Sequence, residues 1–250
     1  MSSARTDPIP AAQQEPARAG PAAGMSAIPA RWTLLACITG PVLLVAYFVT
    51  PAFVSWPSAG ESPGKVAAYA TAHRLLFYLG GWLQATGALL IVVFLLALLQ
   101  RSGARRTLAG AAALIGCAVL LSVVAVEAAM LEAVPVAAAN ADHATVATGF
   151  ELASGVFVRI YPLIPAPLVF AGIGFALSRT SILPRVFART AVLIAGLFLI
   201  AGLAAVFGTA GLTFATVMSV VEAVWIPAAA IAFARTGYSS GAWRPRRSDA

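Results

Sequence analysis

Charged residues are scarce in this chain. Only 10% of its 250 residues are Asp, Glu, Lys or Arg, whereas about 25% is usual in a soluble globular domain. Hydrophobic residues make up 60%, and they occur in blocks long enough to cross a lipid bilayer. So few charges cannot cover a water-exposed surface. We therefore predict an all-α fold, a polytopic helical bundle within a membrane.

Histidine and cysteine are equally rare, with two of each. His73 and His143 lie at or beyond the ends of apolar blocks, which argues against a zinc enzyme or a haem held between two helices. Cys37 and Cys117 are isolated within apolar blocks, as is typical of buried inert thiols. No P-loop, GxSxG or dinucleotide-binding motif is present. We predict no cofactor and no metal, and we favour a function other than catalysis.

Six apolar blocks predict six membrane-spanning helices. The last apolar stretch, residues 191–234, is too long for one crossing, and the glycine-bearing segment 208–211 divides it into two spans. A short amphipathic helix at 65–74 is expected at the membrane interface, and the polar stretch 140–148 is expected to be a loop. The predicted spans are residues 32–54, 75–99, 108–134, 150–177, 191–207 and 212–234.

The two ends of the chain differ in composition from the apolar centre. Residues 1–30 are rich in Ala, Pro, Gln, Ser and Gly and contain no apolar run, so they predict a disordered cytoplasmic tail. Residues 31–236 form the predicted six-span membrane domain. Residues 237–250 carry three arginines and predict a basic cytoplasmic tail.

Positive charge is distributed unevenly about the six predicted spans. Thirteen of the 16 basic residues fall on the side of the two termini, and only Lys65 and Arg74 fall on the other. Cytoplasmic loops carry such an excess of Lys and Arg, so we expect a multi-pass protein of the inner or plasma membrane with both termini cytoplasmic. The expected partners are the bilayer and anionic lipid at the cytoplasmic arginines. No basic, aromatic-lined patch suggests nucleic acid.

Four polar side chains are predicted at similar depth in the outer half of the bundle. They are Gln84, Glu127, Arg159 and Glu222, each on a different span. Ionisable groups within a membrane usually face the bundle interior or a water-filled cavity, so Arg159 is expected to pair with Glu127 or Glu222. The group could form a pocket for a small polar or cationic ligand or for a proton. Alternatively, it could be an ion pair that fixes helix packing.

Three prolines, at 162, 165 and 167, interrupt the fourth predicted span. Each removes a backbone donor. The prolines could break the helix and form a binding site, as broken helices do in transporters. Alternatively, they could produce a kink that is packed against neighbouring helices.

Three stretches of the chain resemble a bacterial membrane family, domain of unknown function 4386. They are VAAYATAHRL at 66–75, ILPR at 182–185 and the glycine-bearing run at 191–202. The resemblance covers residues 31 to 236. It implies a bacterial integral membrane protein of six helices and brings no reaction with it.

Three classes of function are compatible with these features. The first is a small transporter-like or ligand-binding bundle with a polar site in the outer half. The second is a structural or regulatory subunit that packs against another membrane protein. The third, least favoured, is a membrane enzyme that acts on lipids. A water-lined pocket containing Arg159 would favour the first, and a dry Arg159 pair beside an exposed face of small residues would favour the second.

Overall fold

The computed structural model describes residues 30–57, 60–207 and 209–239, and it is helical throughout this part, with no β-strand. The predicted tails fall almost entirely outside the described residues. The helices are α1 (Ala30–Phe53), α2 (Pro63–Ala72), α3 (Arg74–Arg101), α4 (Leu108–Ala139), α5 (His143–Leu163), α6 (Pro165–Ser178), α7 (Arg185–Ala204) and α8 (Thr209–Ser239), with short 3-10 turns η1 (Ala104–Arg106) and η2 (Ala205–Phe207).

Five helical segments are long and apolar enough to cross a membrane: α3, α4, Arg159–Ser178, α7 and Thr213–Thr236 within α8. The described apolar stretch of α1, Leu35–Tyr47, is shorter. The structure is thus an all-helical bundle with five candidate spans. The sixth span, α1, stays a prediction.

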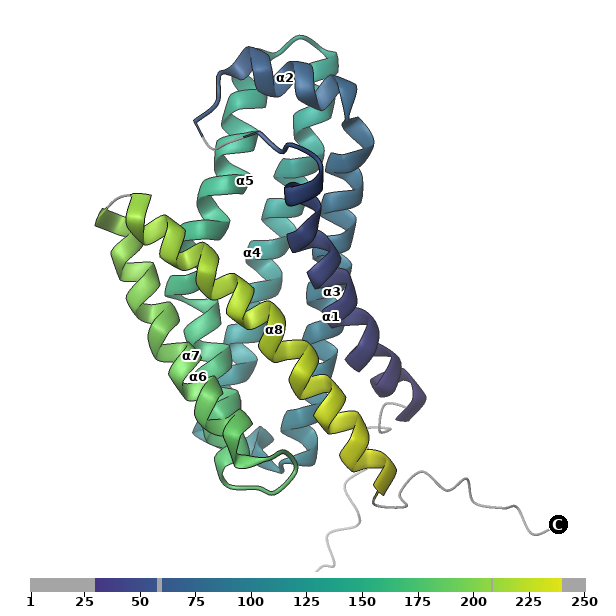
Figure 1. Cartoon of the computed structure of the whole chain (residues 1–250), viewed down its shortest axis with the longest axis vertical. Helices are drawn as coiled ribbons and strands as arrows, with labels where there is room; N and C mark the ends of the chain where they lie inside the picture. The colour runs from purple at the N-terminus through teal and green to yellow at the C-terminus, as the bar shows by residue number, and fades with distance from the viewer. Residues whose placement is uncertain (1–29, 58–59, 208, 240–250) are drawn as a thin grey trace, which may run out of the picture.

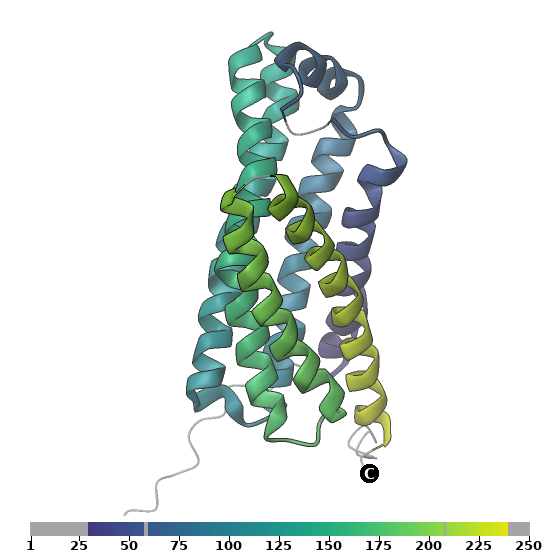
Figure 2. The same ribbon diagram turned by 60° about the vertical axis from the view of Figure 1, so that its left-hand side comes forward.

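The long helices lie roughly along one axis (Figures 1 and 2). α1 packs along α3, and α4 packs against α3, α5 and α6. α7 and α8 form a hairpin that turns at η2. The apolar stretch 191–234 is therefore divided into two helices as predicted, but the turn lies just before the predicted segment 208–211, and α8 already begins at Thr209. In both views the tip of this hairpin ends well short of α2, so the parts of α3, α4 and α5 nearest α2 extend beyond it.

Glycines allow α4 and α6 to approach closely. A Cβ added at Gly172 would lie only 2.6 Å from the carbonyl oxygen of Ala109 and the amide nitrogen of Ala113. A Cβ at Gly116 would lie 2.8 Å from the amide nitrogen of Val169. Small residues at such positions let helix backbones touch, and here they join the first turns of α4 to α6.

The proline-rich part of the fourth predicted span is a break between two helices. α5 ends at Leu163, and α6 begins at Pro165, which has no N–H to continue the helical hydrogen bonds. α7 packs directly on the break, because a Cβ at Gly202 would lie 2.8 Å from the Cα of Leu163. The break is therefore a packed kink.

The end of the molecule that carries α2 has a hydrophobic cluster of its own. α2 lies across α4 and α5 (Figure 1) and buries Val66, Ala67 and Ala70 there. Trp56 packs on Phe77, with ring centroids 4.7 Å apart. The helix predicted at 65–74 is thus present, and its apolar face is covered by protein.

The polar stretch 140–148 was wrongly predicted to be a loop. α5 already begins at His143, and only residues 140–142 connect it to α4. The side chain of Asp142 accepts the backbone N–H of Thr145 at 3.0 Å. This N-cap satisfies a backbone donor in the first turn and lets the helix start within polar sequence.

Exposed arginines gather at the end of the bundle opposite α2. They come from η1 and from the ends of α3, α6, α7 and α8 that lie farthest from α2, and the beginning of α1 lies at the same end (Figure 1). The described members are Arg101, Arg105, Arg106, Arg179, Arg185, Arg189 and Arg235. The charge asymmetry of the sequence is therefore an asymmetry of the folded molecule.

Candidate functional site: two buried acids paired with tyrosines

Three of the four predicted site residues are buried in the bundle. The exposed fraction is 2% for Gln84 on α3, 4% for Glu127 on α4 and 6% for Glu222 on α8. Polar side chains buried among apolar helices are costly unless they find partners. Their partners therefore determine what the site can do.

Glu127 is bound by a tyrosine that sequence reasoning did not select. The hydroxyl of Tyr47 on α1 donates to Oε1 of Glu127 at 3.2 Å. The Gln84 amide lies beside the same carboxyl group, but the two groups are not oriented to form a hydrogen bond. Oε2 of Glu127 and both polar atoms of the Gln84 amide have no hydrogen-bond partner in the described part of the chain.

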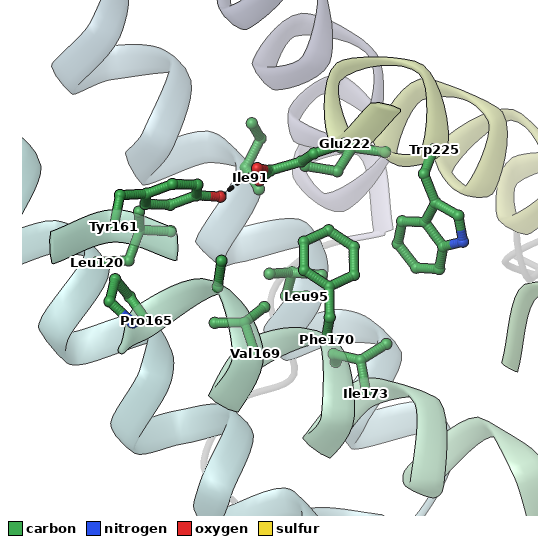
Figure 3. A pocket seen from close by; sticks show the side chains of 12 residues that line it. Ile91, Leu95, Leu120, Tyr161, Pro165, Val169, Phe170, Ile173, Glu222 and Trp225 are labelled. Atoms are coloured by element: carbon green, nitrogen blue, oxygen red, sulfur yellow. Dashed lines mark hydrogen bonds between the residues drawn. The ribbon is translucent and has the colours of Figure 1, made fainter. Parts of the chain in front are cut away.

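Glu222 is bound by a second tyrosine. The hydroxyl of Tyr161 on α5 donates to Oε2 of Glu222 (Figure 3). Tyr161 lies less than one turn before the α5–α6 break, so the break positions this hydroxyl. On α8, the indole N–H of Trp225 donates to Thr190 of α7 at 2.9 Å and fixes the face that carries Glu222.

Two small cavities adjoin these pairs. The first, of about 30 Å³, is lined by Tyr47, Gln84, Tyr161 and Glu222 together with apolar side chains of α1, α3 and α4. The second, of about 10 Å³, lies on the other side of the Tyr161–Glu222 pair and is almost entirely apolar (Figure 3). A water molecule needs roughly 10–15 Å³ of such space. In this conformation the site therefore has room for water and for little else.

Arg159 is not part of this group, contrary to the sequence prediction. Its side chain is exposed, and the ion pair found among the described residues is instead Lys65–Glu61, at 3.1 Å. The reason lies in the packing of α5. Leu163 meets Gly202 near the end of α7, so Arg159, one turn further out, lies close to the level of the α7–α8 turn. The depth of Arg159 was predicted by counting residues from the end of its span. That count did not include the extension of α4 and α5 beyond the α7–α8 turn.

Three further ionisable residues toward the α2 end, Glu132, Glu151 and His73, are exposed. Glu151 accepts the backbone N–H of Gly60 at 2.7 Å. Among the described residues, no three His, Cys, Asp or Glu side chains are grouped as metal ligands would be.

The two tyrosines carried a signal in the sequence. A buried tyrosine usually needs a partner for its hydroxyl, and Tyr47 and Tyr161 both lie inside apolar blocks. An apolar block that also contains an acid is the obvious source of such a partner.

Comparisons of the chain with protein-family models, with curated proteins and with solved structures found no match. The resemblance to domain of unknown function 4386 stays a prediction.

Proposed function

We propose that this chain is a six-span membrane protein whose buried polar site binds a small cation, as in a ligand-binding or transporter-like bundle. The observation that carries the proposal is that Glu127 and Glu222 are buried with no basic partner among the described residues. An ionised carboxylate in an apolar interior is very costly unless it is paired. A proton or a metal ion from solution would supply the missing positive charge.

The topology of the proposal follows from the distribution of arginines. α1 would be the sixth span, since it packs along α3 over much of its length. The arginine-rich end would face the cytoplasm, with both termini, and would contact anionic lipid headgroups. Gln84, Glu127 and Glu222 would then lie in the outer half of the bundle.

The test is a thermal-shift screen of the purified full-length protein. Its melting temperature is measured across pH and in matched chloride salts of lithium, sodium, potassium and choline. A small-cation site predicts a change with pH or with one alkali ion that is reduced in Glu127→Gln and Glu222→Gln. Glu151→Gln, which removes an exposed carboxylate, is the control and should behave like the wild type.

A second function is favoured by the size of the cavities. Spaces of about 30 and 10 Å³ admit no organic ligand, which is what a structural or regulatory subunit would show. In that case neither pH nor any alkali ion should act through Glu127 or Glu222. The protein should instead co-purify with another membrane protein in mild detergent.

A further inference from the structure

The amide of Gln84 restricts what can occupy the larger cavity. It is buried, it lines the cavity, and neither its oxygen nor its nitrogen has a partner in the described structure. Buried polar atoms without protein partners commonly indicate an ordered water or ion. The amide needs an occupant that both donates and accepts hydrogen bonds. Water does both, whereas an alkali ion would satisfy only the amide oxygen.

The size of the cavity points to the same occupant. About 30 Å³ is enough for one or two water molecules, and a hydrated alkali ion is larger than that. A dehydrated ion would need a nearly complete shell of oxygen ligands. The hydroxyls of Tyr47 and Tyr161 already donate to Glu127 and Glu222, so few oxygens remain.

Two carboxyl groups of α4, those of Glu132 and Glu127, lie at successive depths between the outer end and the level of this cavity. Glu132 is exposed, lines an open groove at that end and packs against Gly81, because a Cβ there would lie 3.1 Å from its Oε1. Glu127 lies five residues, roughly 7.5 Å, further down α4 at ~1.5 Å per residue, with its Oε2 unpartnered. Gln84 and the cavity then lead to Glu222.

Glu222 is the last polar residue of this series. The smaller cavity beyond the Tyr161–Glu222 pair is lined by Ile, Leu, Val, Phe and other apolar side chains (Figure 3). The indole N–H of Trp225, which also lines it, is taken by Thr190. In the described residues, no polar side chain continues from Glu222 along this cavity toward the arginine-rich end.

We infer that the cation of this site is the proton, exchanged between Glu222 and the outer end through water in the larger cavity and through Glu127. This inference rests on the small-cation function proposed above. In the exchange an O–H bond of the Glu222 carboxyl breaks, and a lone pair of the cavity water takes up the proton. Glu127 does not itself line the cavity, but its carboxyl group lies beside the Gln84 amide that does. In the proposed exchange the water passes a proton past this amide to Oε2 of an ionised Glu127, so atoms and charge balance without a further reactant.

No basic side chain lies beside the two acids to hold either of them permanently ionised. Tyr47 from α1, Gln84 from α3, Cys117 from α4 and Tyr161 from α5 are the titratable or polar groups that face the site. α7 contributes Thr190, which contacts Trp225 rather than either acid. No lysine, arginine or histidine of the described chain pairs with Glu127 or Glu222.

The experiment is infrared difference spectroscopy of the full-length protein in liposomes. On a jump from acid to alkaline buffer, we expect the protonated-carboxyl band to lose a component that Glu222→Gln lacks and that the Glu151→Gln control keeps. Gln84→Leu, which fills similar volume without polar atoms, should slow the loss of that component at least tenfold. If Glu222→Gln does not fold, Tyr161→Phe assigns the band instead, because losing the hydroxyl donor shifts its frequency.

Three results would count against the inference. A carboxyl band that is the same in the wild type, Glu222→Gln and Tyr161→Phe would overturn it, as would an unchanged rate in Gln84→Leu. Specific stabilisation by lithium, sodium or potassium that requires Glu222 would also overturn it but would leave the small-cation function standing. A protein that responds neither to pH nor to alkali ions through these acids would overturn both.

Discussion

Tyr47 and Tyr161 place a phenol hydroxyl beside each buried acid. A hydroxyl can donate to a carboxyl oxygen whether or not the acid is charged, so it orients the group without fixing its charge. An arginine in the same place would hold the acid ionised. The tyrosines therefore leave Glu127 and Glu222 free to change charge, which is what a cation site requires.

Arg159 should contribute little to stability, because its side chain is exposed and has no acidic partner in the described structure. We expect Arg159→Gln to leave the melting temperature of the detergent-solubilised protein nearly unchanged. Differential scanning fluorimetry of the two proteins side by side checks this. A large fall in melting temperature that a second substitution, Glu127→Gln or Glu222→Gln, recovers would contradict this expectation. It would show that Arg159 forms the ion pair that the sequence suggested.

Asp142 should make the stability of the outer end depend on acid pH. Hydrogen bonds from the side chain and then the backbone of Thr145 hold the pKa of Asp142 below its ordinary value. Its stabilising contribution is therefore present above that ordinary value and is lost as the pH falls through the lowered value in the folded protein. Asp142→Ala should melt slightly below the wild type at neutral pH.

The difference between the two proteins should shrink in acid, as Asp142 becomes protonated in the wild type. Melting curves at several pH values test this. Asp142→Asn is the matched control, since asparagine also caps helices but has no charge to lose. A gap that is constant across pH would show that the charge of Asp142 plays no part.

Among the helices, α4 and α6 are in close backbone contact at Gly172. Gly172→Ala would place a methyl group 2.6 Å from backbone atoms of α4, which cannot move aside as a flexible side chain could. We expect a loss of about 1–3 kcal/mol, as for other overpacked sites. Thermal and denaturant unfolding in detergent would measure it.

Gly196 on α7 supplies the control, because a Cβ there would have no atom within 4 Å. Gly196→Ala should be neutral or stabilise by up to about 1 kcal/mol through helix propensity. Equal losses at both positions would show that close approach of α4 and α6 is not what Gly172 provides.

Positive and negative side chains lie toward opposite ends of the molecule along its long axis. Seven described arginines lie at one end, whereas the described acids outside the site, Glu61, Glu132, Asp142 and Glu151, lie toward the other. This arrangement matches the excess of positive charge in cytoplasmic loops. In the proposed orientation, the open groove and Glu132 would face the outer side, from which cations would arrive.

Topology reporters test the orientation and the number of spans together. Fusions on the α2 side, including one at the start of α8 beside the α7–α8 turn, should report outside, and fusions at the arginine-rich end should report inside. The outside positions are Ala59, Ala141 and Ala210, and the inside positions are Gly103, Ser181 and Ser240. Any one of the six on the opposite side would contradict the six-span topology, and Ala59 in particular decides whether α1 spans.

The sequence by itself determined the helical class, the position of most helices and the separation of charge. Apolar blocks between arginine-bearing connections are a local signal, because membrane solvation acts on each block separately. The glycine-bearing segment 208–211 marked the approximate position of the α7–α8 turn, because the apolar stretch was too long for one crossing. Gln84, Glu127 and Glu222 stood out because a polar residue within an apolar block is costly wherever it lies.

Only the tertiary structure decided which of these polar residues meet. The kink at Leu163, the tilt of α8 and the length of α4 and α5 beyond the α7–α8 turn set the relative heights of side chains on different helices. These offsets moved Arg159 to the surface and brought Tyr161 to Glu222. They arise from packing between helices, such as Gly202 against Leu163, and residue counts along one chain segment do not contain them.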